Sequence, residues 1–352
     1  MEEFKVVNSQ PISAQRIINS TSDHIEEWFE KVTAEAKPAE VRPELMFNMD
    51  ETMLDSSPKS IRVIVPRESL GIRLNSNESE GLHITLVFCI AADGGHLKPS
   101  LILPLKEFPL TLRNFADTFH WAGQSAGWMT AEIFKNWVTA VFIPHVNARR
   151  AALNAPNERA LLFVDSHESR RCVEALQALR EANIDAFTFP SHTSHILQPL
   201  DCGVNRSFKA KLRACKEVAL HTTVDMRRFH LIKLAARAAY DALYPVTVLD
   251  SWATAGISPW SLEGMKASPY VTPNLPPEML QNNQKRKRSA ITLSEKLITS
   301  EVVVSALEKQ LKMKEKPKNP RGRPKKKRAL DPPPLASSPD SMLPSSEEEL
   351  SN

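Results

Sequence analysis

Cysteine, glycine and long apolar runs are all scarce in this sequence. Four cysteines and ten glycines occur among 352 residues, and no two cysteines form a CxxC pair. This spacing predicts neither a disulfide framework nor a zinc ribbon, and we interpret all four cysteines as buried thiols. They are Cys89, Cys172, Cys202 and Cys215. No apolar run reaches the 18 residues of a membrane span, and the first ten residues lack the features of a secretion signal. We therefore expect an intracellular protein with no membrane partner.

Charge is distributed unevenly along the chain. The formal net charge is only +4, but residues 285–328 carry 16 Lys and Arg against 4 Asp and Glu. Residues 329–352 carry five acidic side chains and no basic one, so the rest of the chain is close to neutral. Eight of the 26 prolines also follow residue 284, where apolar residues are few. The sequence thus predicts a folded body and a largely disordered basic C-terminal tail with a polyanionic partner.

The folded body has the periodicities of both strands and helices. Short apolar runs bounded by breakers predict strands at residues 83–90, 97–103, 159–165 and 185–190. Apolar residues at helical spacing predict helices from Thr130 to near Pro144, from Ser166 to Asn183, from Asp201 to Cys215, and over residues 227–244. Strands that come first and then alternate with helices predict an α/β fold, with a central mixed sheet flanked by helices.

Three aspartates stand at positions suited to a ligand. Asp50 lies near the end of a short apolar run, Asp165 ends the predicted strand 159–165, and Asp201 opens a basic helix. Ligands of open α/β sheets bind at the carboxyl ends of strands, so three such carboxylates would form an oxygen cage for Mg²⁺ or Mn²⁺. The alternative for each aspartate is a cap or turn residue. We leave Glu51 out of this set, because neighbouring strand residues point to opposite faces.

Several segments resemble the sequence motifs of one protein family, and they occur in the same order along the chain. MFNMDET, ALLFVDSHES and PSHTSHILQPLDCGVNRSFK are similar to the DDE superfamily endonuclease domain of pogo, Tigger and jerky-type transposases, in the Tc1/mariner group. AADGGHLKPSLIL, GWMTAEIFKNWV and SWATAGISPWS also occur in the family's order, so the resemblance covers residues 12–261. In relatives a Ser-His pair often follows the second acid, whereas here Arg170 stands where that histidine would be.

This resemblance implies a ribonuclease-H-like fold with a catalytic triad of Asp50, Asp165 and Asp201. In the family these acids bind two divalent ions, Mg²⁺ or Mn²⁺, and catalyse hydrolysis and strand transfer on DNA. One ion would activate the attacking water or hydroxyl and the other would stabilise the leaving oxygen. The implied organisation is a helical lead-in at residues 1–40, a catalytic core at 41–265 and a tail at 266–352.

Two segments of the tail carry their own predictions. Thr292 and Glu295 form a predicted capping box for a short helix over residues 292–315. PRGRPKKKR, residues 320–328, resembles an AT-hook, a segment whose narrow Arg-Gly-Arg centre enters the minor groove of A·T-rich DNA. The expected DNA contacts are Arg321, Gly322, Arg323, Pro324, Lys325, Lys326, Lys327 and Arg328. The alternative is a nuclear localisation signal that binds import factors, a role that KRKR at 285–288 also suits.

Two functional hypotheses follow from these patterns. The first is a nuclear, transposase-derived protein with a Mg²⁺-dependent DDE/D endonuclease core that acts on duplex DNA or transposon ends. The second is a domesticated, catalytically inactive protein that binds chromatin through its tail. Intact acids favour the first; Arg170 and the absence of the family's usual helix-turn-helix region ahead of the core favour the second. The sequence leaves a homodimer open.

Overall fold

A six-stranded mixed sheet forms the centre of the computed structural model, which describes residues 13–54, 83–107, 109–214, 223–272 and 291–315. The strands are β1 (Met46–Met53), β2 (Thr85–Ala91), β3 (Ser100–Leu103), β4 (His120–Gly123), β5 (Ala160–Val164) and β6 (Ile184–Thr188). Their order across the sheet is β4-β3-β2-β1-β5-β6. All four strands predicted from apolar runs are present. β4 was not predicted, because HWAG is too short to establish an alternating pattern.

Strand directions define the topology. β1 pairs antiparallel with β2, and β2 pairs antiparallel with β3, so the first three strands form a meander. On the other side of β1, β5 and β6 are added in parallel. Three antiparallel strands, followed by two parallel strands on the far side of the first, form the ribonuclease-H-like arrangement, so the predicted fold class is confirmed. β4 extends the sheet by pairing in parallel with β3.

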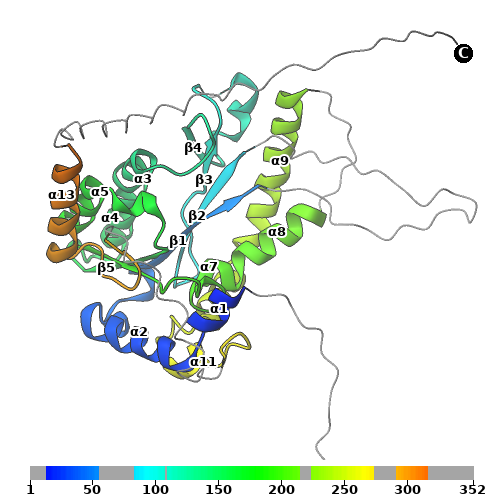
Figure 1. The fold of residues 1–352 in the computed structure, drawn as a ribbon. Coiled ribbons are helices and arrows are strands. Elements are labelled where there is room, and N and C mark those ends of the chain that lie inside the picture. Colours follow the sequence, from blue (N-terminus) through cyan, green and yellow to red (C-terminus); the bar gives the residue numbers. More distant parts are fainter. Residues whose placement is uncertain (1–12, 55–82, 108, 215–222, 273–290, 316–352) are drawn as a thin grey trace, which may run out of the picture.

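Helices cover both faces of the sheet. In Figure 1, α3, α4, α5 and α13 lie on one side and α7, α8 and α9 on the other. Four α-helices precede β5 in the sequence: α1 (Ala14–Asn19), α2 (Ser22–Glu35), α3 (Ala131–Trp137) and α4 (Ile143–Ala152). Those that follow are α5 (Val173–Glu181), α6 (Ser194–Leu197), α7 (Pro199–Cys202), α8 (Val204–Ala214), α9 (Val224–Ala242), α10 (Pro245–Thr254), α11 (Leu262–Lys266) and α13 (Glu301–Glu315).

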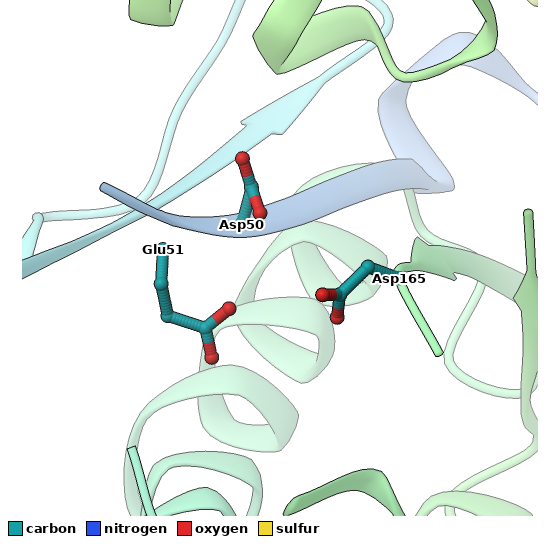
Figure 2. Close-up of side chains that lie close together, drawn as sticks. All are labelled: Asp50, Glu51 and Asp165. Carbon is teal, nitrogen blue, oxygen red and sulfur yellow. The ribbon is translucent and has the colours of Figure 1, made fainter. Parts of the chain in front are cut away.

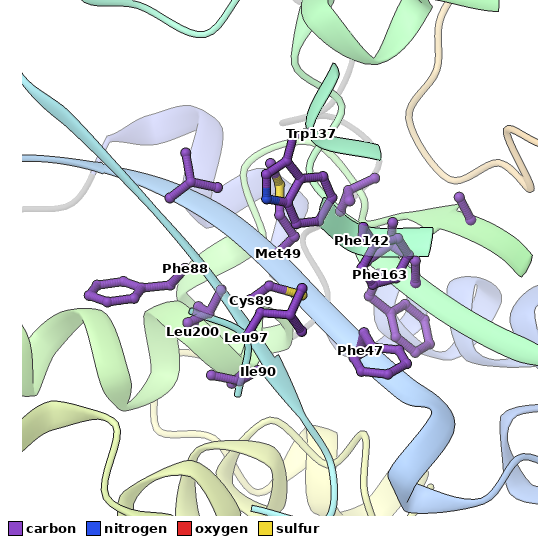
Figure 3. Packing of buried hydrophobic residues seen from close by; sticks show 14 of the residues in the cluster. Phe47, Met49, Phe88, Cys89, Ile90, Leu97, Trp137, Phe142, Phe163 and Leu200 are labelled. Carbon is purple, nitrogen blue, oxygen red and sulfur yellow. The ribbon is translucent and has the colours of Figure 1, made fainter. Parts of the chain in front are cut away.

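The central strand β1 is buried on both faces by these layers. Figure 3 shows Phe47 and Phe142 on one side of β1, with Phe88 and Leu200 on the other. The rings of Phe47 and Phe142 meet edge to face at 5.3 Å, and Phe88 packs in the same manner against Phe208 of α8. Because both faces of β1 are covered, any polar side chain on this strand must find a partner inside the protein.

Several predicted helix boundaries were wrong. The helix predicted from Asp201 is two helices, α7 and α8, on either side of Gly203, and Asp201 lies in the first of them. The helix that begins after Thr130, whose hydroxyl caps Ile133, does not end near Pro144. It passes through a π-helical segment, Val138–Phe142, and Pro144 then occupies the first turn of α4, where its missing N–H leaves no hydrogen bond unmade. Ser166 does not cap the next helix, because residues 168–171 form a separate 3₁₀ turn before α5.

The N-terminal helix α2 belongs to the same hydrophobic core as the sheet. Trp28 of α2 is buried and donates a hydrogen bond from Nε1 to the carbonyl of Thr188, at the end of β6. Its ring lies 6.4 Å from that of Phe163 and 5.6 Å from that of Phe189. α2 therefore closes the end of the parallel half of the sheet.

Residues 291–315 also return to the sheet. Ile298 donates its N–H to the carbonyl of Ala186 on β6, and the hydroxyl of Thr299 accepts from the N–H of the same residue. The predicted helix start at Thr292 was wrong: Glu295 has a positive φ of 58°, and α13 begins at Glu301 after this strand-like contact. Val304 and Leu307 of α13 are buried in the core. The helix is therefore packed in place and does not stand alone.

Other predictions have a mixed outcome. Cys89, Cys172 and Cys202 are buried free thiols, as expected, whereas Cys215 lies outside the described residues. The AT-hook-like segment 320–328 also lies outside them. Among the helices that the structure describes, none is both long and apolar enough to cross a membrane.

The docking of α13 gives a matched pair of substitutions on one helix. Val304 is 4% exposed and Val302 is 80% exposed. Val304→Ala should lower the free energy of unfolding by about 2 kcal/mol, since it removes two buried methyl groups and leaves a cavity, whereas Val302→Ala should change it little. Equal values for both variants in chemical denaturation would contradict the packing of α13 on the core.

Candidate active site

The register of the parallel pair β1–β5 places two of the predicted acids side by side. Asn48 pairs with Phe163, so two residues further along both strands Asp50 lies next to Asp165. Paired residues of parallel strands point to the same face, and the strands are about 4.8 Å apart. Asp165 follows directly after the last residue of β5, Val164. The two carboxylates thus meet where β5 ends and β1 continues.

The side chain of Asn48 joins the three segments that carry the predicted acids. Its amide nitrogen donates to the carbonyl of Phe163 at 3.0 Å, two residues before Asp165. Its amide oxygen accepts from the N–H of Leu200 at 2.9 Å, one residue before Asp201. Asn48 is fully buried, and it lies two residues before Asp50 on the same face of β1. One amide therefore fixes β1, β5 and α7 relative to one another.

Asp201 joins the site through Asn205. The amide nitrogen of Asn205 donates to Asp50 Oδ2 at 2.8 Å and to Asp201 Oδ1 at 3.1 Å. Asp201 lies in α7 and Asn205 in the first turn of α8, which begins directly after Gly203. Asp50 is thus linked to Asp201 through Asn205 and lies beside Asp165, whereas Asp201 is not part of the close group that Asp50 and Asp165 form.

Glu51 enters the cluster as well, which strand alternation alone did not predict. Asp50, Glu51 and Asp165 each offer an oxygen such that these atoms lie within 4.8 Å of one another. Figure 2 shows Asp50 and Glu51 on opposite sides of the β1 ribbon, with Asp165 beside the strand on the side of Glu51. Because β5 ends at Val164, no further strand residue separates the two faces at this point. Both carboxylates can therefore approach Asp165.

The residue that holds Glu51 there is Arg170. Its Nη2 atom donates to both carboxylate oxygens of Glu51 at 2.8 Å and lies 3.1 Å from Asp165 Oδ1. The guanidinium is fully buried and lies over the ring of Phe134, 4.7 Å from its centre. Burial lowers the pKa of Arg170, but the charges of Glu51 and Asp165 outweigh it and raise the pKa overall. Arg170 is therefore a permanent positive charge inside the acidic cluster.

Electrostatic repulsion is concentrated on Asp50. Burial is the main cause that raises the pKa of this carboxyl well above its ordinary value. The charges of its neighbours Asp201, Asp165 and Glu51 raise it further. An ionised Asp50 is thus unfavourable in the protein alone, and a bound cation would offset this repulsion.

The chemistry of the donors fits a hard divalent cation. The cluster offers carboxylate and amide oxygens, the ligands that Mg²⁺ and Mn²⁺ prefer. Among the described residues, Asp165 Oδ1 and Asn205 Oδ1 are buried oxygens that accept no hydrogen bond. Arg170 is close to Asp165 Oδ1, but this is a charge contact without hydrogen-bond geometry. Unmet acceptors of this kind suit a metal ligand.

Some residues of this site were missed at the sequence level. Asn205 had a usable signal, since its spacing of four from Asp201 would place both on one face of the single helix predicted there. Asn48 had a weaker one, as a polar residue within an apolar strand. Arg170 was noticed only as a departure from the family's histidine, and its link to Glu51 depends on chain packing that no local spacing reveals.

Part of this chain matches a known family model. Residues 82–234 match the family model described as DDE superfamily endonuclease, a span that includes Asp165 and Asp201. Asp50 lies ahead of the matched span and is tied to it by the β1–β5 register.

Curated relatives are of the same kind. Human Tigger transposable element-derived protein 7 is 26% identical over 206 residues, which cover 56% of this chain and 37% of that protein. Mouse Jerky protein is 24% identical over 126 residues, covering 36% of this chain and 22% of that protein. The matches therefore span 37% and 22% of the lengths of these two relatives. Residues 82–234 thus match a DDE superfamily endonuclease model, and these relatives are proteins of the Tigger and Jerky type.

A solved structure, the Mos1 strand transfer complex, has a TM-score of 0.46 and 11% identity, and the match covers 74% of this chain and 64% of that one. The strand order and directions described above define the fold without this likeness.

The raised pKa of Asp50 predicts an unusual pH dependence of stability. The folded protein binds a proton at Asp50 more tightly than the unfolded chain does. The stability that this tighter proton binding at Asp50 contributes is therefore lost as pH rises from about 4 through the raised pKa. In EDTA, Asp50→Asn should unfold at a higher temperature than the wild type at pH 7, and the gain should vanish toward pH 4.

Asp185→Asn is the matched control, because Asp185 lies on β6 and pairs with Arg159 outside the cluster. It should not stabilise the protein at either pH. A lower unfolding temperature for Asp50→Asn at pH 7 would contradict the repulsion described here.

Proposed function

We propose that this chain is the core of a transposase-derived DNA endonuclease and strand transferase that uses Asp50, Asp165 and Asp201. The observation that carries the proposal is the close approach of Asp50, on β1, to Asp165, at the end of β5, in a ribonuclease-H-like sheet, with Asp201 of α7 linked to Asp50 through the amide of Asn205. The family match and the relatives named above support the same reaction class.

The three aspartates would hold Mg²⁺ or Mn²⁺, and the family's pattern implies two such ions. When bound, such ions activate an attacking water or hydroxyl and neutralise the leaving oxygen of a phosphodiester. The protein's own contribution is positioning. Asn205 keeps the carboxylates of Asp50 and Asp201 together, and Asn48 fixes the backbone beside Asp165 and Asp201.

DNA is the proposed substrate at the core. α8 begins three residues after Asp201 and carries four basic side chains beside buried apolar ones. The basic residues are Arg206, Lys209, Lys211 and Arg213. A polyanion that reaches the acids would lie close to this helix, where positive charge favours phosphate groups. A DNA-acting role also makes the nucleus the proposed location.

A second proposed DNA contact is the tail segment 320–328. Its two arginines, Arg321 and Arg323, flank Gly322, an arrangement that suits the narrow minor groove of A·T-rich DNA. The runs 285–288 and 324–328 would also serve nuclear import. If the core does not cleave DNA, this segment alone would give a chromatin-binding protein.

The nuclease proposal predicts nicking of supercoiled plasmid DNA that needs Mg²⁺ or Mn²⁺. Asp165→Asn should lower the nicking rate by at least about 100-fold, because it weakens a carboxylate that would hold the ion. Asp185→Asn, on the neighbouring strand β6, should keep the wild-type rate. Undiminished nicking by Asp165→Asn would contradict the site, and no nicking by the wild type would favour the inactive, DNA-binding alternative.

The tail proposal predicts a change in the salt dependence of DNA binding. Replacing Arg321 and Arg323 with Gln removes two phosphate or groove contacts, so the slope of log K against log salt should fall by about 2. Preference for A·T-rich over G·C-rich duplexes should disappear with it. An unchanged slope in fluorescence anisotropy titrations would place DNA binding elsewhere, and α8 would be the next surface to substitute.

A further inference from the structure

Arg170 is the feature of the cluster that the proposed reaction does not require. A fully buried guanidinium loses its hydration, and only well-placed acidic partners offset that cost. Arg170 has two, a bidentate contact with Glu51 and a charge contact with Asp165. Ser169 Oγ also accepts from its Nη1 at 2.8 Å, and the Phe134 ring covers one face. The side chain is therefore held on several sides.

The acidic cluster consequently has two unlike halves, one on each face of β1. On one face, Glu51 and Met49 lie with Arg170, whose positive charge is already present. On the other face, Asp50, Asn205 and Asp201 have no cation among the described residues that contacts them within salt-bridge distance. Asp165 lies at the strand end between the halves and contacts the first through Oδ1.

We propose that Arg170 is a built-in counter-cation, a positioning residue that fills the Glu51 half and leaves only the Asp50–Asp201 half open to a divalent ion. This inference rests on the proposed function to the extent that the cluster is taken as a cation site. It changes the expected stoichiometry: this chain binds one divalent ion with high affinity where the family's pattern implies two. Arg170 supplies the remaining positive charge and keeps the Asp165 carboxylate in place.

Removing the guanidinium should therefore leave space beside Glu51 and Asp165 and leave their negative charges unbalanced, so that a second cation can bind there. In Arg170→Gln, Glu51 and Asp165 lose their counter-charge, so the protein should unfold at a lower temperature in EDTA. Added Mn²⁺ should raise the unfolding temperature of this variant more than that of the wild type. Counting bound Mn²⁺ by electron paramagnetic resonance should give one ion per wild-type chain and two per Arg170→Gln chain.

The matched control is Arg150→Gln. Arg150 is also buried, but its guanidinium donates to the backbone carbonyls of Ala182 and Asn183. This variant should lose stability equally with and without Mn²⁺ and bind one ion. Arg170→Lys, which keeps the positive charge, should return the ion count to one. If Arg170→Gln does not fold, Glu51→Gln combined with Arg170→Gln removes both members of the pair and should still bind one ion.

The outcomes separate this inference from the nuclease proposal, since none of these measurements uses DNA cleavage. One ion in the wild type and two in Arg170→Gln would support the counter-cation role even if no nicking is found. Two ions in the wild type, no ion in either protein, or the same Mn²⁺ response in Arg170→Gln and Arg150→Gln would overturn it.

Discussion

The repulsion between carboxylates crowded at one edge of the sheet is the constraint on which the rest of the site depends. Asp50 is buried and has three acidic neighbours, and its pKa is raised first by burial and then by the charges of these neighbours. The protein offsets this repulsion in two ways. On one face, the amide nitrogen of Asn205 donates to both Asp50 and Asp201. On the other, the guanidinium of Arg170 is the counter-charge of Glu51 and Asp165.

Carboxylates that repel one another stay close only if the backbone that carries them is rigid. Asn48 provides this rigidity, because its single buried amide hydrogen-bonds to the backbone of β5 and of α7, while its own strand carries Asp50. The aromatic packing of Phe47 with Phe142 and of Phe88 with Phe208 then fixes β1 between two layers of helices. Stability and site geometry are thus set by the same strand, so few substitutions in β1 would affect one without the other.

The sequence predicted much of this, and its failures have identifiable causes. Strands such as β2 and β5 are continuous apolar runs, so their existence could be predicted locally, and the three aspartates could be chosen because each follows or opens such an element. Glu51 was excluded by strand alternation, which holds for Cβ directions but not for a long side chain at a point where the adjacent strand has ended. The start of α13 was misplaced because Ile298 pairs with Ala186, more than a hundred residues earlier, and such a pairing leaves no local signal.

The packing of α13 has a consequence for the basic segment beyond it. The helix ends at Glu315, and residue 320 can lie no more than about 18 Å from there, since a chain extends by at most about 3.6 Å per residue. DNA held by residues 320–328 would therefore stay tethered near the body. Tethering raises the effective concentration of the duplex around the core to the millimolar range typical of short linkers, so even weak affinity at the acidic cluster could lead to productive encounters.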